Sequence, residues 1–176
     1  MKLVYKIPDK LYYIQNFLDY PTYKKLHHDV FKSKSIELIS SKNRWSKKVM
    51  YGHKNYVKSN KLHVNYLPLQ KIKILLENNP FHKVKIKHFK PDIHSMEDGA
   101  GINWHDDHCY KYGITYYINR RWNHYFGGEF LFKDKYNKGF IPIVGNSIVI
   151  VKAPLNHKVA PVHKPLLPRK TIQIFI

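Results

Sequence analysis

Apolar residues recur at helical spacing in two segments of the first half of the chain. The first segment follows the helix-start signal Asp19-Tyr20-Pro21. Its apolar side chains are Tyr23, Leu26, Val30 and Phe31. The second segment runs from Pro68 to Asn79, and its apolar side chains are Leu69, Ile72, Leu75 and Leu76. Because residues on one face of a helix lie three or four positions apart, both patterns predict amphipathic helices.

After Pro80 the pattern changes from helical to alternating. Residues 82–88 alternate Lys with other residues, which predicts a strand with one covered face. Later strand-like runs, separated by Gly or Pro, are 112–119, 129–133, 140–144, 147–151 and 171–176. Two helices followed by about seven or eight strands make an α+β protein, in which the helical first third is a supporting layer.

The segment between the two predicted helices is polar and basic. Residues 40–61 show only weak periodicity, which predicts a loop or an edge hairpin. Loops of this kind often form the rim of an active site.

Length and cysteine content indicate one domain in a reducing compartment. A chain of 176 residues is long enough to bury a substantial core as a single domain. No apolar run approaches the ~18 residues of a membrane-spanning helix, and the start Met1–Lys6 is too polar for a signal peptide. The single Cys109 cannot form an internal disulfide, so we expect a cytoplasmic protein without a membrane partner.

The net charge of +19 and the isoelectric point near 9.9 would ordinarily indicate a polyanionic partner such as nucleic acid. Only four of the 31 basic residues are arginines, at positions 44, 120, 121 and 169. Proteins that read nucleic acid rely on Arg and on clustered aromatic residues, whereas the lysines here are scattered and the composition is typical of an AT-rich genome. Nucleic acid therefore stays open as a partner on charge alone.

The residues with the clearest chemistry are His105 and Asp107. Two side chains at i and i+2 of a strand point to the same face, and a second imidazole follows much later at His157. Two histidines and one carboxylate can bind Fe(II) from one side and leave its other coordination positions open. This combination indicates a reactive metal centre rather than a structural ion.

Other residues compete for these roles. His163 also precedes Arg169 and is an alternative to His157. Asp106, His108 and Cys109 could bind Zn(II), although adjacent residues of a strand point to opposite faces and would not share a site with His105. The large side chains Trp104, Trp122 and Phe130 are expected in the core, and Gly127-Gly128 is expected in a turn with positive φ.

The candidate metal residues belong to an ordered set of five elements. These are His105-Asp106-Asp107; Tyr116-Tyr117-Ile118-Asn119 followed by Trp122; Gly127-Gly128-Glu129; His157-Lys158-Val159-Ala160-Pro161-Val162; and Arg169 at the start of the last predicted strand. In this order the sequence resembles the 2-oxoglutarate (2OG) and Fe(II)-dependent oxygenases, and among them the prolyl-hydroxylase-like branch. The resemblance extends from about residue 82 to residue 176.

The resemblance implies a double-stranded β-helix, the jelly-roll or cupin-type barrel, with the metal ligands at one mouth. Residues 81–176 would form the barrel core, and residues 1–80 would add helical support and the rim loop, within the single domain 1–176. It further implies His105, Asp107 and His157 as iron ligands.

The resemblance also implies a binding site for the distal carboxylate of 2OG. Arg169 would pair with that carboxylate, because a guanidinium can donate two parallel hydrogen bonds to it. Tyr117 would add a hydrogen bond from its hydroxyl. Tyr116 lies on the opposite face of the predicted strand, and a register slip of one residue would exchange the two tyrosines.

The implied activity is a dioxygenase that uses Fe(II), 2OG and O2, with ascorbate as a candidate further cofactor. It would hydroxylate a C–H bond, first of all in a prolyl residue of a protein or peptide, and convert 2OG to succinate. The segment Lys90–Gly101 departs from the branch because it is longer, and Phe89 just before it and His94 within it stand where the branch has a tyrosine. The substrate therefore stays open, with a nucleic-acid-modifying oxygenase and a non-catalytic basic binding module as alternatives, and no feature indicates the oligomeric state.

Overall fold

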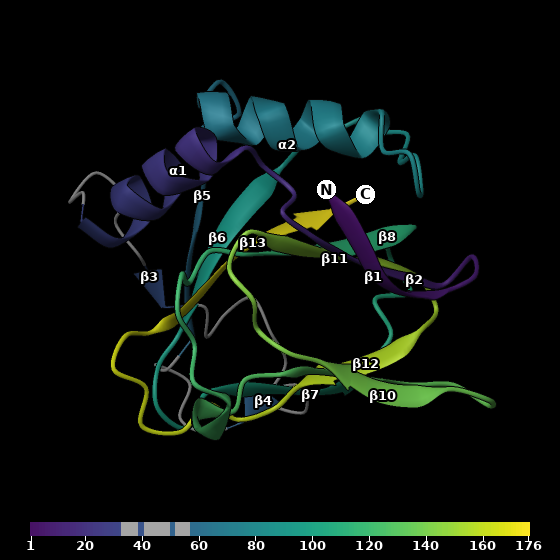
Figure 1. Cartoon of the computed structure of the whole chain (residues 1–176). Coiled ribbons are helices and arrows are strands. Elements are labelled where there is room, and N and C mark those ends of the chain that lie inside the picture. Colours follow the sequence, from purple (N-terminus) through teal and green to yellow (C-terminus); the bar gives the residue numbers. More distant parts are fainter. Residues whose placement is uncertain (33–38, 41–49, 52–56) are drawn as a thin grey trace.

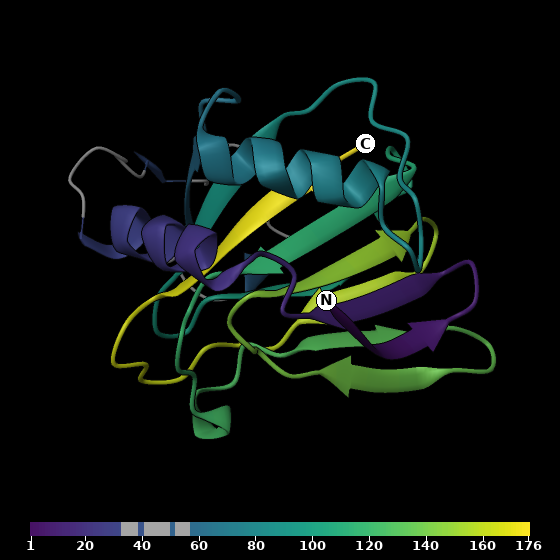
Figure 2. The same cartoon turned by 45° about the horizontal axis from the view of Figure 1, so that its top comes forward.

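The computed structural model describes residues 1–32, 39–40, 50–51 and 57–176. In this part of the chain two antiparallel sheets face each other, and two helices, α1 (Tyr20–Lys32) and α2 (Leu67–Glu77), lie across the outer face of the larger sheet (Figures 1 and 2). The predicted combination of helices on one side of a β structure is confirmed.

The larger sheet has eight strands. In spatial order they are β1 (Lys2–Ile7), β2 (Leu11–Gln15), β11 (Ser147–Lys152), β8 (Tyr112–Tyr117), β13 (Arg169–Phe175), β6 (Pro91–Met96), β5 (Val57–Lys61) and β3 (Ile39–Ser40). Every pairing within it is antiparallel. Its central strands β8 and β13 face the smaller sheet on one side and the helices on the other.

The smaller sheet has five strands. In spatial order they are β10 (Lys138–Ile141), β9 (Phe130–Lys133), β12 (Asn156–Val159), β7 (Gly101–His105) and β4 (Met50–Tyr51). A short 3-10 helix, η1 (His124–Phe126), precedes β9. Successive strands lie in different sheets after β3, β4, β6, β7, β8, β10, β11 and β12, so residues distant in sequence meet in the gap between the sheets.

The order predicted from the sequence, helices first and strands afterwards, is wrong. The hairpin β1–β2 precedes α1, and β2 pairs with β11 inside the larger sheet. Residues 11 to 14 are all buried, with Leu11 and Tyr13 facing the gap and Tyr12 and Ile14 facing the helices. A strand covered on both faces shows no alternation of apolar and polar residues, which is why the pattern did not predict it.

The strand predicted over residues 82–88 is also wrong. Val84 and Ile86 are buried and the neighbouring lysines are exposed, so the alternation does reflect one covered face. The segment nevertheless pairs with no strand of the described chain, and its hydrogen bond to α2 runs from the Val84 amide to the Leu76 carbonyl (3.0 Å). The strand of this region is β6, whose six residues are all buried.

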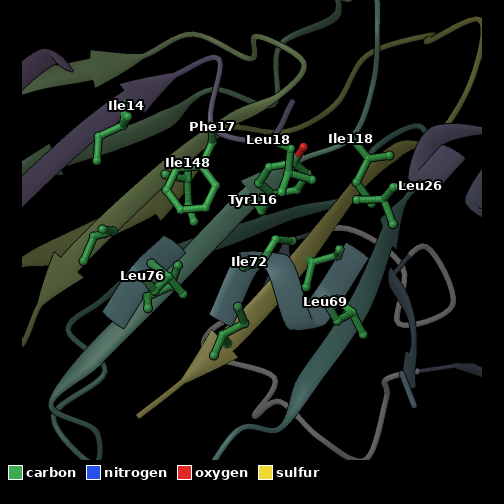
Figure 3. Packing of buried hydrophobic residues seen from close by; sticks show 14 of the residues in the cluster. Ile14, Phe17, Leu18, Leu26, Leu69, Ile72, Leu76, Tyr116, Ile118 and Ile148 are labelled. Atoms are coloured by element: carbon green, nitrogen blue, oxygen red, sulfur yellow. The ribbon is translucent and has the colours of Figure 1, made fainter. Parts of the chain in front are cut away.

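The main hydrophobic core lies between the helices and the larger sheet. Leu26 of α1 and Leu69, Ile72 and Leu76 of α2 are fully buried, and Figure 3 shows them gathered over Tyr116 and the neighbouring strand residues. Removing one such side chain from water stabilises the fold by about 1.5–3 kcal/mol. The helices therefore fix the larger sheet from outside and leave its inner face available to the gap.

Two further predictions concern loops. Most of the polar segment 40–61 lies outside the described residues, apart from residue 40, β4 and β5. Gly127 and Gly128 have φ values of 63° and 77°, as the predicted turn requires. In the described part of the chain, no helix combines the length and apolarity needed to cross a membrane.

Asp19 caps the N-terminus of α1. Its carboxylate accepts hydrogen bonds from the backbone amide of Thr22 (3.0 Å) and from the Thr22 hydroxyl (2.8 Å), and the Lys71 ammonium lies 3.0 Å away. These contacts, the Thr22 amide first, lower the pKa of Asp19 from 3.8 to about 2. The cap also joins α1 to α2 through Lys71.

We expect Asp19→Ala to lower the free energy of unfolding by about 1 kcal/mol at pH 7. Because the pKa of Asp19 is lower in the folded state, its charge stabilises the fold above pH 3.8, and this contribution is lost as the pH falls towards 2. Urea unfolding at pH 7 and pH 3 should therefore show a smaller gap between wild type and variant at pH 3. Asp19→Asn, which keeps a capping oxygen, is the control and should retain most of the stability; an equal gap at both pH values would contradict this account.

Candidate metal and co-substrate site

Three candidate metal-binding side chains converge at one end of the gap between the sheets. His105 lies opposite His157 in the pairing of β7 with β12, and their ring centroids are 4.2 Å apart. Asp107 lies two residues beyond the end of β7, in a left-handed conformation with φ of 51°. The Asp107 carboxylate lies beside His105, as predicted. The reason differs from the predicted one: a turn at Asp107, and not the alternation of side chains along a strand, places the carboxylate there.

The donor atoms of these residues form a compact group. Asp107 Oδ1 lies 3.6 Å from His105 Nε2, and Asp107 Oδ2 lies 3.4 Å from His157 Nε2. One ligand atom from each of the three residues lies within 4.8 Å of the others. Such spacing allows one ion to contact all three, and we call His105, Asp107 and His157 the triad.

Both histidines are oriented by the backbone. His105 Nδ1 lies 2.7 Å from the Asn103 carbonyl oxygen, and His157 Nδ1 lies 2.8 Å from the Leu155 carbonyl oxygen. Because a carbonyl only accepts, each Nδ1 carries the proton and each Nε2 offers its lone pair towards Asp107. Burial, assisted by the neighbouring His157 ring, lowers the pKa of His105 and keeps it in the neutral form that binds metals.

Gly113 of β8 makes room for the Asp107 carboxylate. A Cβ atom at Gly113 would lie 2.7 Å from Asp107 Oδ2, closer than a carbon and an oxygen can approach. Phe130 supports the triad from another side, because its ring stacks on His157 with centroids 5.0 Å apart. Gly113 was not predicted as a site residue, although a glycine inside the apolar strand sequence Tyr112–Tyr117 is a signal that another group approaches closely.

Arg169, the first residue of β13, lies deep in the same gap and is fully buried. Its Nε donates to the Gly128 carbonyl oxygen (2.9 Å), and its Nη1 lies 3.6 Å from Met96 Sδ. Its Nη2 has no hydrogen-bond partner in the described part of the chain. No carboxylate within this part of the chain forms an ion pair with Arg169, and an uncompensated buried cation is unfavourable.

Tyr117 lies beside Arg169 and faces the gap. The guanidinium carbon is 5.3 Å from the centre of the Tyr117 ring, and the Tyr117 hydroxyl, like Arg169 Nη2, is buried without a hydrogen-bond partner among the described residues. Burial raises the pKa of Tyr117 to about 12, so the hydroxyl keeps its proton and can donate. Tyr116 faces the helices instead, where its hydroxyl donates to Asn146 Oδ1 (2.9 Å).

A row of buried polar side chains connects Arg169 with the triad. Thr171 and Gln173 follow Arg169 on the inner face of β13, and Thr115 lies across from Gln173 on β8. The Thr115 hydroxyl donates to Gln173 Oε1 (2.9 Å), and Gln173 Nε2 donates to Thr171 Oγ1 (3.1 Å). We call Thr115, Thr171 and Gln173 the polar track. None of the three was predicted from the sequence.

The alternative metal residues lie elsewhere. His163 is exposed, with Nδ1 3.9 Å from Asp98 Oδ1, and it is not part of the triad. His108 Nδ1 lies 2.8 Å from Asp106 Oδ1 at the surface, and Cys109 is exposed. The structure thus brings His157 to His105 and Asp107, and separates the candidate zinc ligands from that group.

The three large side chains expected in the core have different surroundings. Phe130 is 3% exposed, and Trp122 is half-buried and packs edge-on against Phe126. Trp104 is not a core residue, because Lys133 and Lys158 place their ammonium groups 4.3 Å and 5.4 Å from its ring centre.

Comparison with known families adds to this geometry. The model of the 2OG-Fe(II) oxygenase superfamily matches residues 91–176, the segment that carries the triad, Arg169 and Tyr117. Through these residues the chain belongs to the 2OG-Fe(II) oxygenase superfamily. Membership implies Fe(II), 2OG and O2 as the reactants of an oxidoreductase. No curated protein matches the sequence significantly.

Solved structures of oxygenases share the fold. A Pseudomonas putida prolyl-4-hydroxylase aligns with a TM-score of 0.70 at 13% identity, over 94% of this chain and 91% of that chain. A Trichoplax adhaerens prolyl hydroxylase in complex with a hypoxia inducible factor peptide aligns with a TM-score of 0.69 at 16% identity, over 96% and 83%. OsALKBH1 aligns with a TM-score of 0.68 at 10% identity, over 98% of both chains. The predicted double-stranded β-helix is confirmed.

We expect Gly113→Ala to weaken binding of Mn(II), a redox-stable probe for Fe(II), by about 10- to 100-fold, the usual cost of disturbing a group that orients a metal ligand. The added methyl would displace the Asp107 carboxylate. Isothermal titration calorimetry measures the affinity. Gly139→Ala is the control, because its methyl would meet the Phe132 ring rather than a carboxylate; unchanged Mn(II) affinity in Gly113→Ala would show that Asp107 is not a ligand.

Proposed function

We propose that this protein is an Fe(II)- and 2OG-dependent dioxygenase that hydroxylates a prolyl residue in a protein or peptide. The observation that carries the proposal is the pairing of the triad at one end of the gap with a buried guanidinium and phenol at the other. The polar track lies between them. A dicarboxylate that contacts a metal through one end and Arg169 through the other fits this arrangement.

The donor set suits iron. His105 and His157 would bind it through Nε2 and Asp107 through its carboxylate, which leaves the remaining coordination positions for other reactants. When bound together, iron, 2OG and O2 supply the oxidation of a C–H bond, with conversion of 2OG to succinate and carbon dioxide. The chain's own contribution is to hold these groups in place and away from bulk water.

Arg169 and Tyr117 would hold the far carboxylate of 2OG. Nη2 and the Tyr117 hydroxyl are donors without partners in the described chain, and a carboxylate accepts from both. Binding would also compensate the positive charge of Arg169, which forms no ion pair with a carboxylate of the described residues. Thr171 and Thr115 line the path to the triad with hydroxyl groups.

Two observations bear on the substrate. The likeness to two prolyl hydroxylases, one of them in complex with a peptide, supports a prolyl residue. The net charge of +19 and the likeness to OsALKBH1 support nucleic acid as the competing substrate. Incubating the Fe(II)-loaded protein with proline-containing peptides or with methylated oligonucleotides, and measuring succinate together with the mass of each substrate, separates the two.

The exposed Cys109, which forms no disulfide, supports action in a reducing compartment such as the cytoplasm. Ascorbate is the reductant that we propose for maintaining iron as Fe(II) there. Both points rest on the proposed chemistry.

We expect His157→Ala to abolish 2OG turnover and Mn(II) binding while the fold persists, because Nε2 of His157 is one of three donor atoms. His163→Ala should leave both properties unchanged, since His163 lies at the surface. Succinate formation and calorimetry report the two properties, and circular dichroism checks the fold. Full turnover in His157→Ala would refute the assignment of this histidine as a ligand.

Tyr117→Phe and Tyr116→Phe form a matched pair. Tyr117→Phe should weaken 2OG binding in the presence of Mn(II) by about 5- to 10-fold, equivalent to one hydrogen bond, with little loss of stability because its hydroxyl has no partner within the described chain. Tyr116→Phe should instead leave 2OG binding unchanged and lower the free energy of unfolding, since it removes the hydrogen bond to Asn146. Calorimetry and urea unfolding measure the two effects; a loss of 2OG affinity only in Tyr116→Phe would contradict the assignment.

A further inference from the structure

A second cavity adjoins the triad on the side away from Arg169. Its volume is about 520 Å³, within the size range of small-molecule sites, which is about 300–1,000 Å³. Its lining comes from the end of β5, the start of β6, the end of β13 and the turn after Asp107. The lining residues are Lys61, Leu62, Val64, Lys90, Pro91, Asp92, His94, Asp107, Tyr110 and Phe175.

This cavity reaches Asp107 but neither Arg169 nor Tyr117. Because β13 runs from Arg169 to Phe175, the two residues mark opposite ends of the inner face of that strand. Under the proposed function the deep end is taken by 2OG. The cavity near Phe175 is then the place from which a substrate C–H bond can approach the metal.

Five of the ten lining residues are apolar or aromatic, and the mouth of the cavity is partly exposed. Pro91 and Phe175 line the inside, and the Tyr110 ring packs against Phe175 with centroids 4.8 Å apart. Val64 and Tyr110 are 42% and 46% exposed. Exposed apolar side chains beside a cavity suit a substrate that inserts one residue and covers the mouth with its neighbours.

The charges of the cavity are arranged by depth. Asp92 is 5% exposed and lies on the inner face of β6, whereas Lys61 and Lys90 are exposed where the chain enters and leaves the sheet beside it. Apart from Asp92, Asp107 is the one carboxylate among the lining residues, and a bound metal would offset its charge. The mouth is therefore positive and the interior is not.

Lys61 and Lys90 differ from several other lysines of this chain. Lys10, Lys25, Lys58 and Lys71 each pair with an aspartate or glutamate. No ion pair joins Lys61 or Lys90 to any carboxylate of the described residues. Both ammonium groups are thus available to an anion on an incoming molecule.

We propose that the substrate carries a carboxylate next to the residue that is hydroxylated, and that Lys61 and Lys90 recognise this carboxylate at the mouth. The inference rests on the proposed function, because it assigns the cavity to that substrate. The carboxylate stays at the mouth with the two ammonium groups while the apolar residue enters past Pro91 and Phe175. The carboxylate is either the side chain of an adjacent Asp or Glu in a peptide or the α-carboxylate of free or C-terminal proline.

The test combines charge reversal with a substrate series. The variant is Lys61→Glu with Lys90→Glu, and the control is Lys24→Glu with Lys138→Glu, which changes the net charge equally at exposed lysines outside the cavity. The substrates are peptides with one proline flanked by Asp, by Asn or by Lys, a peptide ending in proline, and free L-proline. Succinate formation gives KM and kcat for each.

For the wild type and the control we expect KM for the Asp-flanked peptide to be about tenfold lower than for the Lys-flanked one, with similar kcat and a difference that shrinks in high salt. The variant should reverse the order. A low KM only for free L-proline or the C-terminal proline would support the proposal and identify the α-carboxylate. Equal KM for all five substrates in the wild type, or no change in the variant, would overturn it.

A second readout separates this proposal from the proposed function. Fluorescence anisotropy of the labelled Asp-flanked peptide, the Lys-flanked peptide and the peptide ending in proline, measured with the Mn(II)-loaded protein, needs no turnover. If no proline is hydroxylated but the acidic peptide still binds more tightly and the variant reverses this preference, the prolyl assignment fails and the carboxylate recognition stands. If neither the Asp-flanked peptide nor the peptide ending in proline binds more tightly than the Lys-flanked peptide, the carboxylate recognition fails whatever the reaction.

Discussion

The pairing of β7 with β12 is the contact on which the site depends. It sets His105 opposite His157, and a slip of one residue would turn one imidazole out of the gap between the sheets. The next pair is Val159 opposite Ile102, and the register of the two strands shifts between these two pairs. The position of the two histidines is therefore set by their own pairing at the triad end of the strands. Each ring is then held by a backbone carbonyl two residues earlier, which ties its orientation to the same strands.

Around this pairing, the larger sheet provides the opposite wall. Its outer face is covered by α1 and α2, and its inner face carries Gly113, the polar track and Arg169. The two faces of one strand therefore have different roles. In β8, Tyr116 packs in the core under the helices, whereas Tyr117 faces the gap. Because the apolar core under the helices stabilises the fold, large apolar side chains are not needed in the space beside the triad.

The buried guanidinium of Arg169 has an energetic consequence. Its Nε donates to the Gly128 carbonyl oxygen and its Nη1 to Met96 Sδ, but no carboxylate of the described chain forms an ion pair with it. A ligand that supplies the missing negative charge binds only the folded form and so adds to its stability. Gly128 is part of the same arrangement, because a Cβ there would lie 2.9 Å from Arg169 Cδ.

Local spacing in the sequence predicted much of this. The apolar faces of both helices, the cap at Asp19 and the pair His105 and Asp107 follow from patterns within a few positions, and the ordered motifs added His157, Arg169 and Tyr117. What the sequence did not reveal depends on contacts across the fold. Strands β2 and β6 are covered on both faces and lack alternation, and residues 82–88 alternate because one side is covered although no strand pairs with them. The role of Gly113 is visible only once Asp107 is placed above it.

The position of β13 bears on how this protein is made. It follows every other strand in sequence, yet it lies in the middle of the larger sheet, hydrogen-bonded to β6 on one side and β8 on the other. On the ribosome, those two strands must wait with unpaired edges until it emerges, and open edges of this kind favour association with other chains. Closure of the sheet and arrival of the buried guanidinium then occur in one late step, so a nascent chain completes its larger sheet and buries Arg169 together.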